Sequence, residues 1–207
     1  MMQTGALIVA AGKSSRMGDF KPMLQLGSIS IAQRVINNFR QAGISKIVVV
    51  TGYNADALER HLASNHVIFL RNEDYETTHM FDSVRIGLEY LKDKVDTVLF
   101  TPVDVPLFTA HTVTQMLSLG QPPVCNGTPG HPILIRSSLI ESILSNDGNT
   151  GLKGAVEHCG TPMYCLNVED PGIIHDADTP EDYVELLRAH NQSLIRSEIQ
   201  IQLAREK

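Results

Sequence analysis

Short, continuous apolar runs alternate with helically spaced apolar residues through the first 120 residues, and this pattern constrains the fold most strongly. Continuous apolar runs of strand length suit strands that are buried on both faces, as in parallel sheets. Strands that alternate with helices predict βαβ units around a mostly parallel sheet. We expect strands at 6–10, 46–51, 66–70 and 96–101. We expect helices at 31–39, 55–64, 84–91 and 109–118.

The second half of the chain continues with shorter elements. We expect short strands at 124–125 and 132–135, helices at 139–144 and 151–159, and a last strand at 163–168. A helix over 181–189 follows, with Thr179 as its N-cap and Pro180 at its first position. The predicted fold class is α/β, with three α/β/α layers and a mostly parallel, twisted sheet. Ligands of such sheets bind at the carboxyl ends of the strands.

The composition indicates one ordered domain in a reducing compartment. Of 207 residues, 43% are hydrophobic and 19% are charged, as in ordinary globular domains. The formal charge of −6 disfavours binding to nucleic acid or to a membrane surface. No apolar run approaches the ~20 residues that cross a bilayer, and the N-terminus lacks the basic region of a signal peptide. Three cysteines without CxxC spacing indicate reduced thiols and a cytoplasmic protein.

The loop after the first strand concentrates positive charge. Lys13, Arg16 and Lys21 lie within nine residues of an otherwise acidic chain. A glycine-rich turn after a buried strand presents backbone N–H groups that suit phosphate oxygens, and cations strengthen that attraction. The loop is not a P-loop, because Leu7 stands where GxxxxGK[ST] needs glycine, nor a GxGxxG loop, because Ser14 stands at the second glycine. A solvated basic loop is the alternative interpretation.

The same loop resembles the signature L-x-A-A-G-x-S-x-R-M-G-x-x-K of MobA/MocA-type NTP transferases, the molybdopterin nucleotidyltransferases of the GT-A-like superfamily. Nine positions agree: Ile8, Ala10, Ala11, Gly12, Ser14, Arg16, Met17, Gly18 and Lys21. The resemblance implies Mg²⁺-dependent transfer of a nucleotidyl group from an NTP to a small phosphorylated acceptor, with release of pyrophosphate. It implies Arg16, Lys21 and Asp104 as catalytic residues. The implied nucleotide-binding residues are Ala10, Ala11, Gly12, Lys13, Ser14, Ser15, Arg16, Lys21, Met80 and Ser83.

Three later motifs extend the resemblance through most of the chain. Asp104 matches the aspartate of the family's D-x-P motif, which implies a Mg²⁺ ligand, and Asp176 matches the second metal position in a D-x-D-T-P-E-D motif. In that motif, Asp178 is assigned to support of the turn. His131 matches a G-H-P element on the acceptor side. The segment before the third helix departs from the family, because His79 replaces the glycine of Gly-Met-x-x-Ser.

The end of the first strand carries the information on the base. Guanylyl members of the family have Ala-Gly-Gly there and cytidylyl members have Ala-Ala-Gly, which this chain has at Ala10, Ala11 and Gly12. The resemblance therefore favours CTP as the nucleotide and molybdopterin as the acceptor. Sugar-nucleotide enzymes also use Ala-Ala-Gly, so a sugar-phosphate nucleotidyltransferase (pyrophosphorylase) is an alternative. A non-catalytic nucleotide sensor is another.

The last residues stand outside the motif set. We expect one nucleotidyltransferase domain over 1–190 and a tail over 191–207, which is either a solvated helix or a contact in a dimer. A further interpretation is that the tail begins a second domain, because 199–207 is similar to the opening of winged-helix domains in molybdate-responsive regulators. The oligomeric state is left open.

Overall fold

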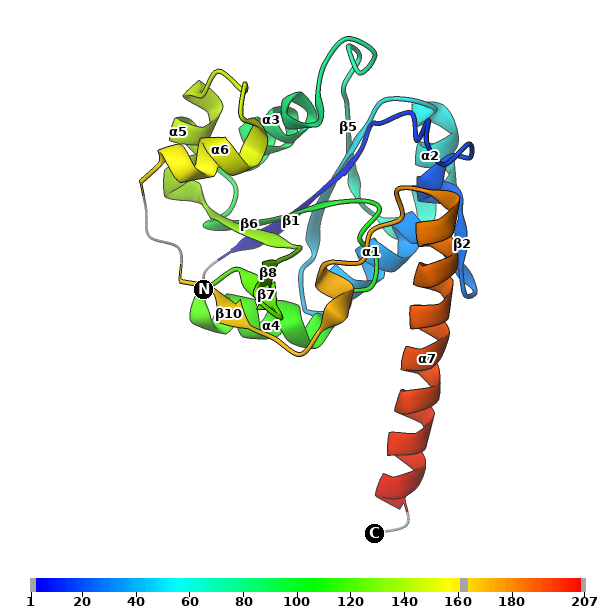
Figure 1. The fold of residues 1–207 in the computed structure, drawn as a ribbon. Coiled ribbons are helices and arrows are strands. Elements are labelled where there is room, and N and C mark those ends of the chain that lie inside the picture. The colour runs from blue at the N-terminus through cyan, green and yellow to red at the C-terminus, as the bar shows by residue number, and fades with distance from the viewer. Residues whose placement is uncertain (1–2, 161–163, 206–207) are drawn as a thin grey trace.

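The computed structural model describes residues 3–160 and 164–205, in which helices cover both faces of a central five-stranded sheet (Figure 1). The strand order is β5-β4-β1-β6-β9. The first four strands run parallel, and β9 pairs antiparallel with β6. The strands are β1 Thr4–Ala10, β4 Lys46–Thr51, β5 Ile68–Arg71, β6 Thr97–Pro102 and β9 Ile133–Arg136. The predicted α/β fold with a mostly parallel sheet is confirmed.

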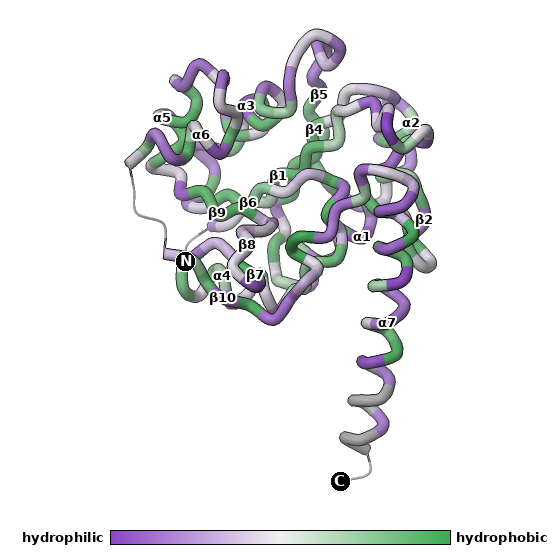
Figure 2. Tube along the Cα trace, viewed as in Figure 1, coloured by the Kyte–Doolittle hydropathy of each residue, from purple (hydrophilic) through white to green (hydrophobic). Residues whose placement is uncertain are grey.

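Alternate residues of β1 face opposite helical layers, as the pleat of a strand requires. Ala6 and Ile8 pack with one layer, whereas Leu7 and Val9 pack with the other. The first layer contains α1 Ile31–Gln41, α2 Ala55–His61 and α4 Ala110–Leu119. The second contains α3 Met80–Leu91, α5 Ile140–Ser145 and α6 Gly151–His158. Hydrophobic residues therefore follow the central strands (Figure 2), and the apolar runs fill two cores.

Two small sheets were not fully predicted. The hairpin of β2 Gln25–Leu26 and β3 Ile29–Ser30 follows the basic loop, and its Ser30 caps α1 through a capping box with Gln33. A second sheet joins β10 Leu166–Asn167, β7 Pro123–Cys125 and β8 Thr128–Pro129. The strand predicted over 163–168 is shorter in the structure, and Met163 lies outside the described residues. Short 3₁₀ turns lie at Lys21–Met23, Ala63–Asn65, Ser137–Leu139 and Pro171–Ile173.

The last helix, α7 Pro180–Arg205, is much longer than the predicted 181–189. It begins as predicted at Thr179, whose N–H and hydroxyl both donate to the Asp182 carboxylate at 2.8 Å. Neither glycine nor proline occurs between 181 and 205, so no helix breaker ends it early. Its outer half projects away from the body of the protein (Figure 1). The predicted domain boundary at residue 190 lies inside this helix, and the division into domain and tail stays a prediction.

The carboxyl ends of the parallel strands meet at one edge of the sheet. The N–H of Tyr53, beyond β4, donates to the Ala11 carbonyl at 3.0 Å, and the N–H of Val103, beyond β6, donates to the Val9 carbonyl at 3.0 Å. The loops that follow these strands are thereby held together around β1. Within the described residues, no helix combines the length and hydropathy of a membrane span.

Candidate active site

A cleft of about 240 Å³ opens at this edge, beyond the carboxyl ends of β1 and β6. Ten of the predicted site residues line it. They are Ala10, Ala11, Gly12, Ser14, Ser15, Arg16, Lys21, Met80, Ser83 and Asp104. The structure therefore brings three separate sequence segments to one cavity, which is where open parallel sheets bind their ligands.

The basic loop folds back on itself beneath the cleft. Ser14 adopts a left-handed conformation (φ 54°), and its carbonyl accepts a hydrogen bond from the N–H of Met17 at 3.0 Å. Its hydroxyl accepts from the N–H of Lys21 at 3.3 Å, which ties the two ends of the loop together. Gly12 faces open space, since a Cβ there would meet no neighbouring atom within 4 Å. The loop thus leaves room for a ligand against its backbone at Gly12.

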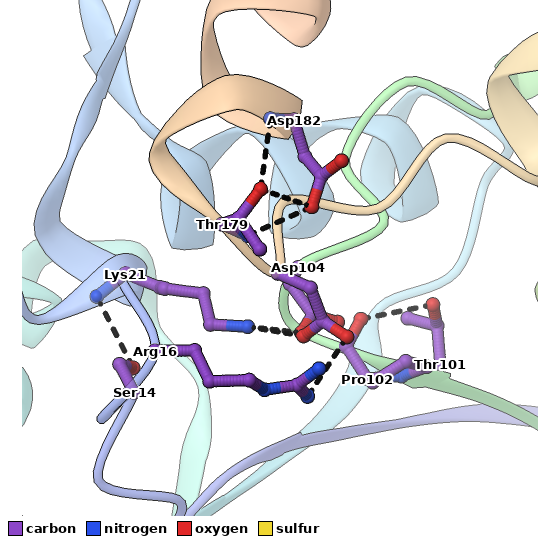
Figure 3. A network of polar contacts seen from close by, with 9 residues as sticks. Ser14, Arg16, Lys21, Thr101, Pro102, Asp104, Thr179 and Asp182 are labelled. Atoms are coloured by element: carbon purple, nitrogen blue, oxygen red, sulfur yellow. Dashed lines mark hydrogen bonds and ion pairs between the residues drawn. The ribbon is translucent and has the colours of Figure 1, made fainter. Parts of the chain in front are cut away.

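Two cations and two carboxylates form a chain of ion pairs across the cleft. The Nζ atom of Lys21 lies 3.0 Å from Oδ2 of Asp104 and 2.7 Å from Oδ1 of Asp178. Arg16 binds the other oxygen of Asp178 at 2.9 Å. Figure 3 shows the side chains of Lys21 and Arg16 extending beside each other from the basic loop toward these carboxylates. The Lys21 side chain is only 10% exposed, whereas that of Arg16 is 70% exposed, so Lys21 forms the inner end of the cluster.

This arrangement perturbs the charged groups in opposite directions. Burial alone would lower the pKa of the Lys21 ammonium, but hydrogen bonding and attraction to Asp178 and Asp104 outweigh it and raise that pKa. The hydrogen bond from Lys21 lowers the pKa of the Asp178 carboxyl. Both groups are therefore held in their charged forms, and a charged ligand must compete with these contacts.

Asp178 is a residue that the sequence assigned only to the turn. The N–H of Ala177 donates to the Asp104 carbonyl at 3.1 Å, which fixes the segment before α7 beside the end of β6. The helix start at Thr179 then directs the chain away from the cleft. Because of this backbone link, Asp178 reaches both cations of the basic loop. The second aspartate of the D-x-D motif was the signal that could have identified Asp178 as a site residue. The sequence analysis explained that aspartate by the turn before the helix and gave it no role in binding.

Asp176, a predicted metal residue, is exposed and does not line the cleft. Partial burial of its carboxyl group and repulsion from Asp178 and Asp104 raise its pKa. The three carboxyl groups of Asp104, Asp176 and Asp178 therefore bring more negative charge to this region than Lys21 neutralises. Within the described residues, no three such groups lie close enough to hold a metal ion by themselves. Mg²⁺ usually takes one or two carboxylates together with substrate phosphates, so this donor set fits an ion that arrives with a triphosphate.

Besides Asp176, two other predicted residues, Lys13 and His131, do not line the cleft. Lys13 pairs instead with Glu76 at 2.8 Å, and both side chains are about half exposed or more. His131 is not among the residues that line the cleft, and its ring forms a T-shaped contact with the ring of Phe100 at a centroid distance of 5.7 Å. Burial lowers the pKa of His131, and its Nδ1 atom is buried with no hydrogen-bond partner among the described residues. Their predicted roles in binding nucleotide and acceptor stay predictions.

The loop after β5 supplies a wall of the cleft that the sequence did not reveal. Asn72, Tyr75, Thr78 and His79 line it beside Met80. Their position directly after a parallel strand was the signal that could have identified them, because such loops meet at the ligand edge. Of these four residues, only His79 belongs to a motif of the sequence analysis, in which it replaces the glycine of Gly-Met-x-x-Ser.

Comparison with known proteins gives consistent matches. Residues 6–162 match the family model described as the MobA-like NTP transferase domain. The molybdenum cofactor cytidylyltransferase of Escherichia coli (strain K12) is 30% identical over 192 residues, which cover 89% of this chain and 95% of that protein. The bifunctional protein GlmU of Staphylococcus haemolyticus is 31% identical over 118 residues, but these cover 56% of this chain and only 26% of that protein.

Solved structures share the fold. A nucleotidyl transferase from Methanothermobacter thermautotroptrophicus superposes with a TM-score of 0.78 at 21% identity, over 92% of this chain and 99% of its own. Rv0371C of Mycobacterium tuberculosis H37Rv, in a complex with manganese, gives a TM-score of 0.72 at 21% identity, over 90% of this chain and 98% of its own. At these identities the likeness supports the three-layer architecture and nothing finer.

Proposed function

From the premise that this chain belongs to the MobA-like NTP transferase family and is a nucleotidyltransferase, we propose that it transfers CMP from CTP to molybdopterin. An oxygen of the acceptor phosphate forms a bond to the α-phosphorus of CTP. The bond from that phosphorus to the bridging oxygen breaks, and pyrophosphate leaves. The proposed compartment is the cytoplasm, which holds the triphosphate pool.

The observation that carries this proposal is the placement of Arg16 and Lys21 against the carboxylates of Asp178 and Asp104 in one cleft at the strand ends. A triphosphate offers these cations anionic oxygens that compete with their present carboxylate partners. Lys21 is a compact point charge, and Arg16 is a planar fork of donors, so together they suit two neighbouring phosphate groups. Backbone N–H groups between Gly12 and Ser15 add uncharged donors.

Asp104 and Asp176 are the residues that we propose to hold Mg²⁺. When bound, the ion would neutralise charge on the phosphates and orient them. The manganese complex of the fold relative is consistent with a divalent cation in this architecture. The same carboxylates would otherwise repel the triphosphate, which explains why acidic residues line a site for an anionic substrate.

The protein's own contribution is alignment and charge compensation. Arg16 and Lys21 bind the departing phosphates and stabilise the negative charge that develops on them as the bond breaks. Holding both substrates in one cleft replaces an encounter in solution by an aligned, effectively unimolecular reaction. No general base is required, because a phosphate acceptor is already anionic at neutral pH. His131 is proposed to face the acceptor side.

The choice of CTP depends on Ala11. Ala11 lines the cleft and is buried at its edge, and we propose that its methyl group, in place of the hydrogen of a glycine, excludes or displaces one edge of a base. Ala11→Gly is expected to raise the relative activity with GTP over that with CTP. Equal changes for both nucleotides would contradict this assignment of the base.

The proposal is tested by measuring pyrophosphate release with each of the four NTPs, Mg²⁺ and molybdopterin. We expect turnover with CTP, and loss of turnover in Asp104→Asn. Turnover with a hexose 1-phosphate but not with molybdopterin would instead support a sugar-phosphate nucleotidyltransferase (pyrophosphorylase). Binding of NTP without pyrophosphate release from any acceptor would support a nucleotide sensor.

A further inference from the structure

We propose that Asn72 is a positioning residue that fixes the polarity of the Ser83 hydroxyl, so that this hydroxyl donates a hydrogen bond to the base of the bound nucleotide. The inference rests on the proposed function of the cleft, and it adds a residue outside the motifs that suggested that function. Asn72 follows β5, Ser83 lies in the first turns of α3, and both line the cleft.

The orientation of the Asn72 amide is determined by its surroundings. Its Oδ1 atom accepts from the backbone N–H of Asp74 at 3.1 Å, and a backbone N–H can only donate. The Nδ2 group must therefore face the opposite side. There it donates to the hydroxyl oxygens of Thr78 and Ser83, each at 2.9 Å. Asn72 itself is only 4% exposed, so water does not readily compete for these bonds.

The two hydroxyls that receive these bonds differ in what they do with their own protons. Thr78 donates its proton to the Asp74 carbonyl at 2.9 Å, so its donor is used within the loop. Ser83 has no hydrogen-bond acceptor among the described residues, and Asn72 is its one partner there. Since the Asn72 amide occupies a lone pair of the Ser83 oxygen, the proton of Ser83 is directed away from Asn72. Ser83 lines the cleft but is only 2% exposed, so that proton is available only to an acceptor atom of a ligand that is seated directly against it.

The ligand chemistry that fits is a heteroaromatic base with an acceptor atom on its edge. Cytosine presents two such atoms, its ring N3 and its O2. The exposed thioether of Met80, one turn before Ser83 and also in the cleft, gives an apolar surface on which a base can lie. The cations Arg16 and Lys21 stand on the basic loop across the cleft, so base and phosphates have separate partners.

Asn72→Asp tests the idea because it reverses the polarity with little change in shape. The carboxylate still accepts from the Asp74 N–H, but it cannot donate to Ser83 and instead accepts the Ser83 proton. We expect the dissociation constant for CTP with Mg²⁺ to rise about tenfold, the scale of one net hydrogen bond. The dissociation constant for inorganic tripolyphosphate, which lacks a base, should change less than about twofold on the same scale. Equal weakening of both ligands would show charge repulsion and overturn the inference.

A double-mutant cycle with Ser83→Ala provides the second test. Ser83→Ala alone is expected to weaken CTP binding, and because it removes one buried hydrogen bond from the Asn72 amide, its melting temperature should fall by about 2–4 °C. If Asn72 acts through Ser83, adding Asn72→Asp to Ser83→Ala produces little further loss of CTP affinity. Additive losses of CTP affinity in the double variant would overturn the inference. Unchanged CTP binding by Ser83→Ala would also overturn it, and this second test remains valid even if Asn72→Asp does not fold. Failure of the wild-type protein to bind CTP at all would instead overturn the proposed function together with the inference.

Discussion

Replacing Lys21 with methionine removes the positive charge from the centre of the cleft while keeping the length of the side chain. The Lys21 ammonium contacts both Asp104 and Asp178, and its side chain is 10% exposed. Removing one partner of a fully buried pair typically costs about 3–5 kcal/mol. Here the two carboxylates are 18% and 30% exposed, and Arg16 still neutralises Asp178. We therefore expect Lys21→Met to lower the free energy of unfolding by about 2 kcal/mol at neutral pH.

Thermal unfolding checks this value. For a chain of this size, a loss of 2 kcal/mol corresponds to a decrease in melting temperature of about 4–8 °C. The matched control is Lys13→Met in the same loop, where the ion pair with Glu76 is exposed, and no measurable decrease is expected. Because Lys21 lowers the pKa of Asp178, its contribution is present at neutral pH and is lost as pH falls through the pKa of the folded state. The difference between wild type and Lys21→Met should therefore narrow only below about pH 4, the ordinary pKa of an aspartate in the unfolded chain.

Added Mg²⁺ makes the test more specific. In Lys21→Met, Asp104 and Asp178 lack their ammonium partner, so Mg²⁺ should raise the melting temperature of this variant more than that of the wild type. Equal destabilisation by Lys21→Met and Lys13→Met would refute the reasoning, because it would mean that burial does not strengthen the inner pair. A Lys21→Met protein that is insensitive to Mg²⁺ would show that Asp104 and Asp178 do not bind the ion without a triphosphate.

Three further outcomes are expected. Gly12→Ala should leave the melting temperature unchanged, because the added Cβ meets no protein atom within 4 Å. It should weaken NTP binding at least tenfold in a titration, which is roughly the effect of one steric clash with a ligand. Unchanged affinity would contradict a nucleotide at Gly12. Asp104→Asn should lower the rate of pyrophosphate release by roughly a hundredfold or more. A chelator should abolish the wild-type reaction without changing the melting temperature of the nucleotide-free protein. A large decrease in that melting temperature would indicate a resident structural metal. Because burial lowers the pKa of His131, the unfolded chain binds a proton below about pH 6.5 that the folded chain does not bind. The free energy of unfolding should therefore fall below that pH, and it should fall less in His131→Gln. Identical profiles of this free energy against pH for both proteins, measured by chemical denaturation, would exclude a buried, neutral His131.

The sequence predicted the elements whose side chains have one clear pattern. The apolar run that became β1 is buried on both faces, and its neighbours were found for the same reason. The hairpin of β2 and β3 was missed because strands of two residues have no measurable periodicity. The length of α7 was missed because its outer half is largely polar, so the apolar stripe that marks a packed helix fades before the helix ends.

The candidate site was predictable where a motif carried the chemistry and not where tertiary contacts did. Arg16, Lys21 and Asp104 stood out as charged residues after buried strands, and all three line the cleft. Asp178 and Asn72 did not, because each has a plain local explanation, as a residue before a helix start and as a polar residue after a strand. Their importance appears only when the loops of the sheet edge are brought together.

The ion pair between Lys21 and Asp178 joins residues that are 157 positions apart in the chain. Contacts of such separation close a very large loop, and the entropy of that closure places them late in folding. A polypeptide that ends before residue 178 retains every strand of the parallel sheet but has an incomplete cleft. Nucleotide that binds to this cleft bridges the beginning and the end of the domain, so it stabilises the protein against global unfolding rather than against local opening. Nucleotide affinity is therefore a direct measure of how completely a given molecule has folded.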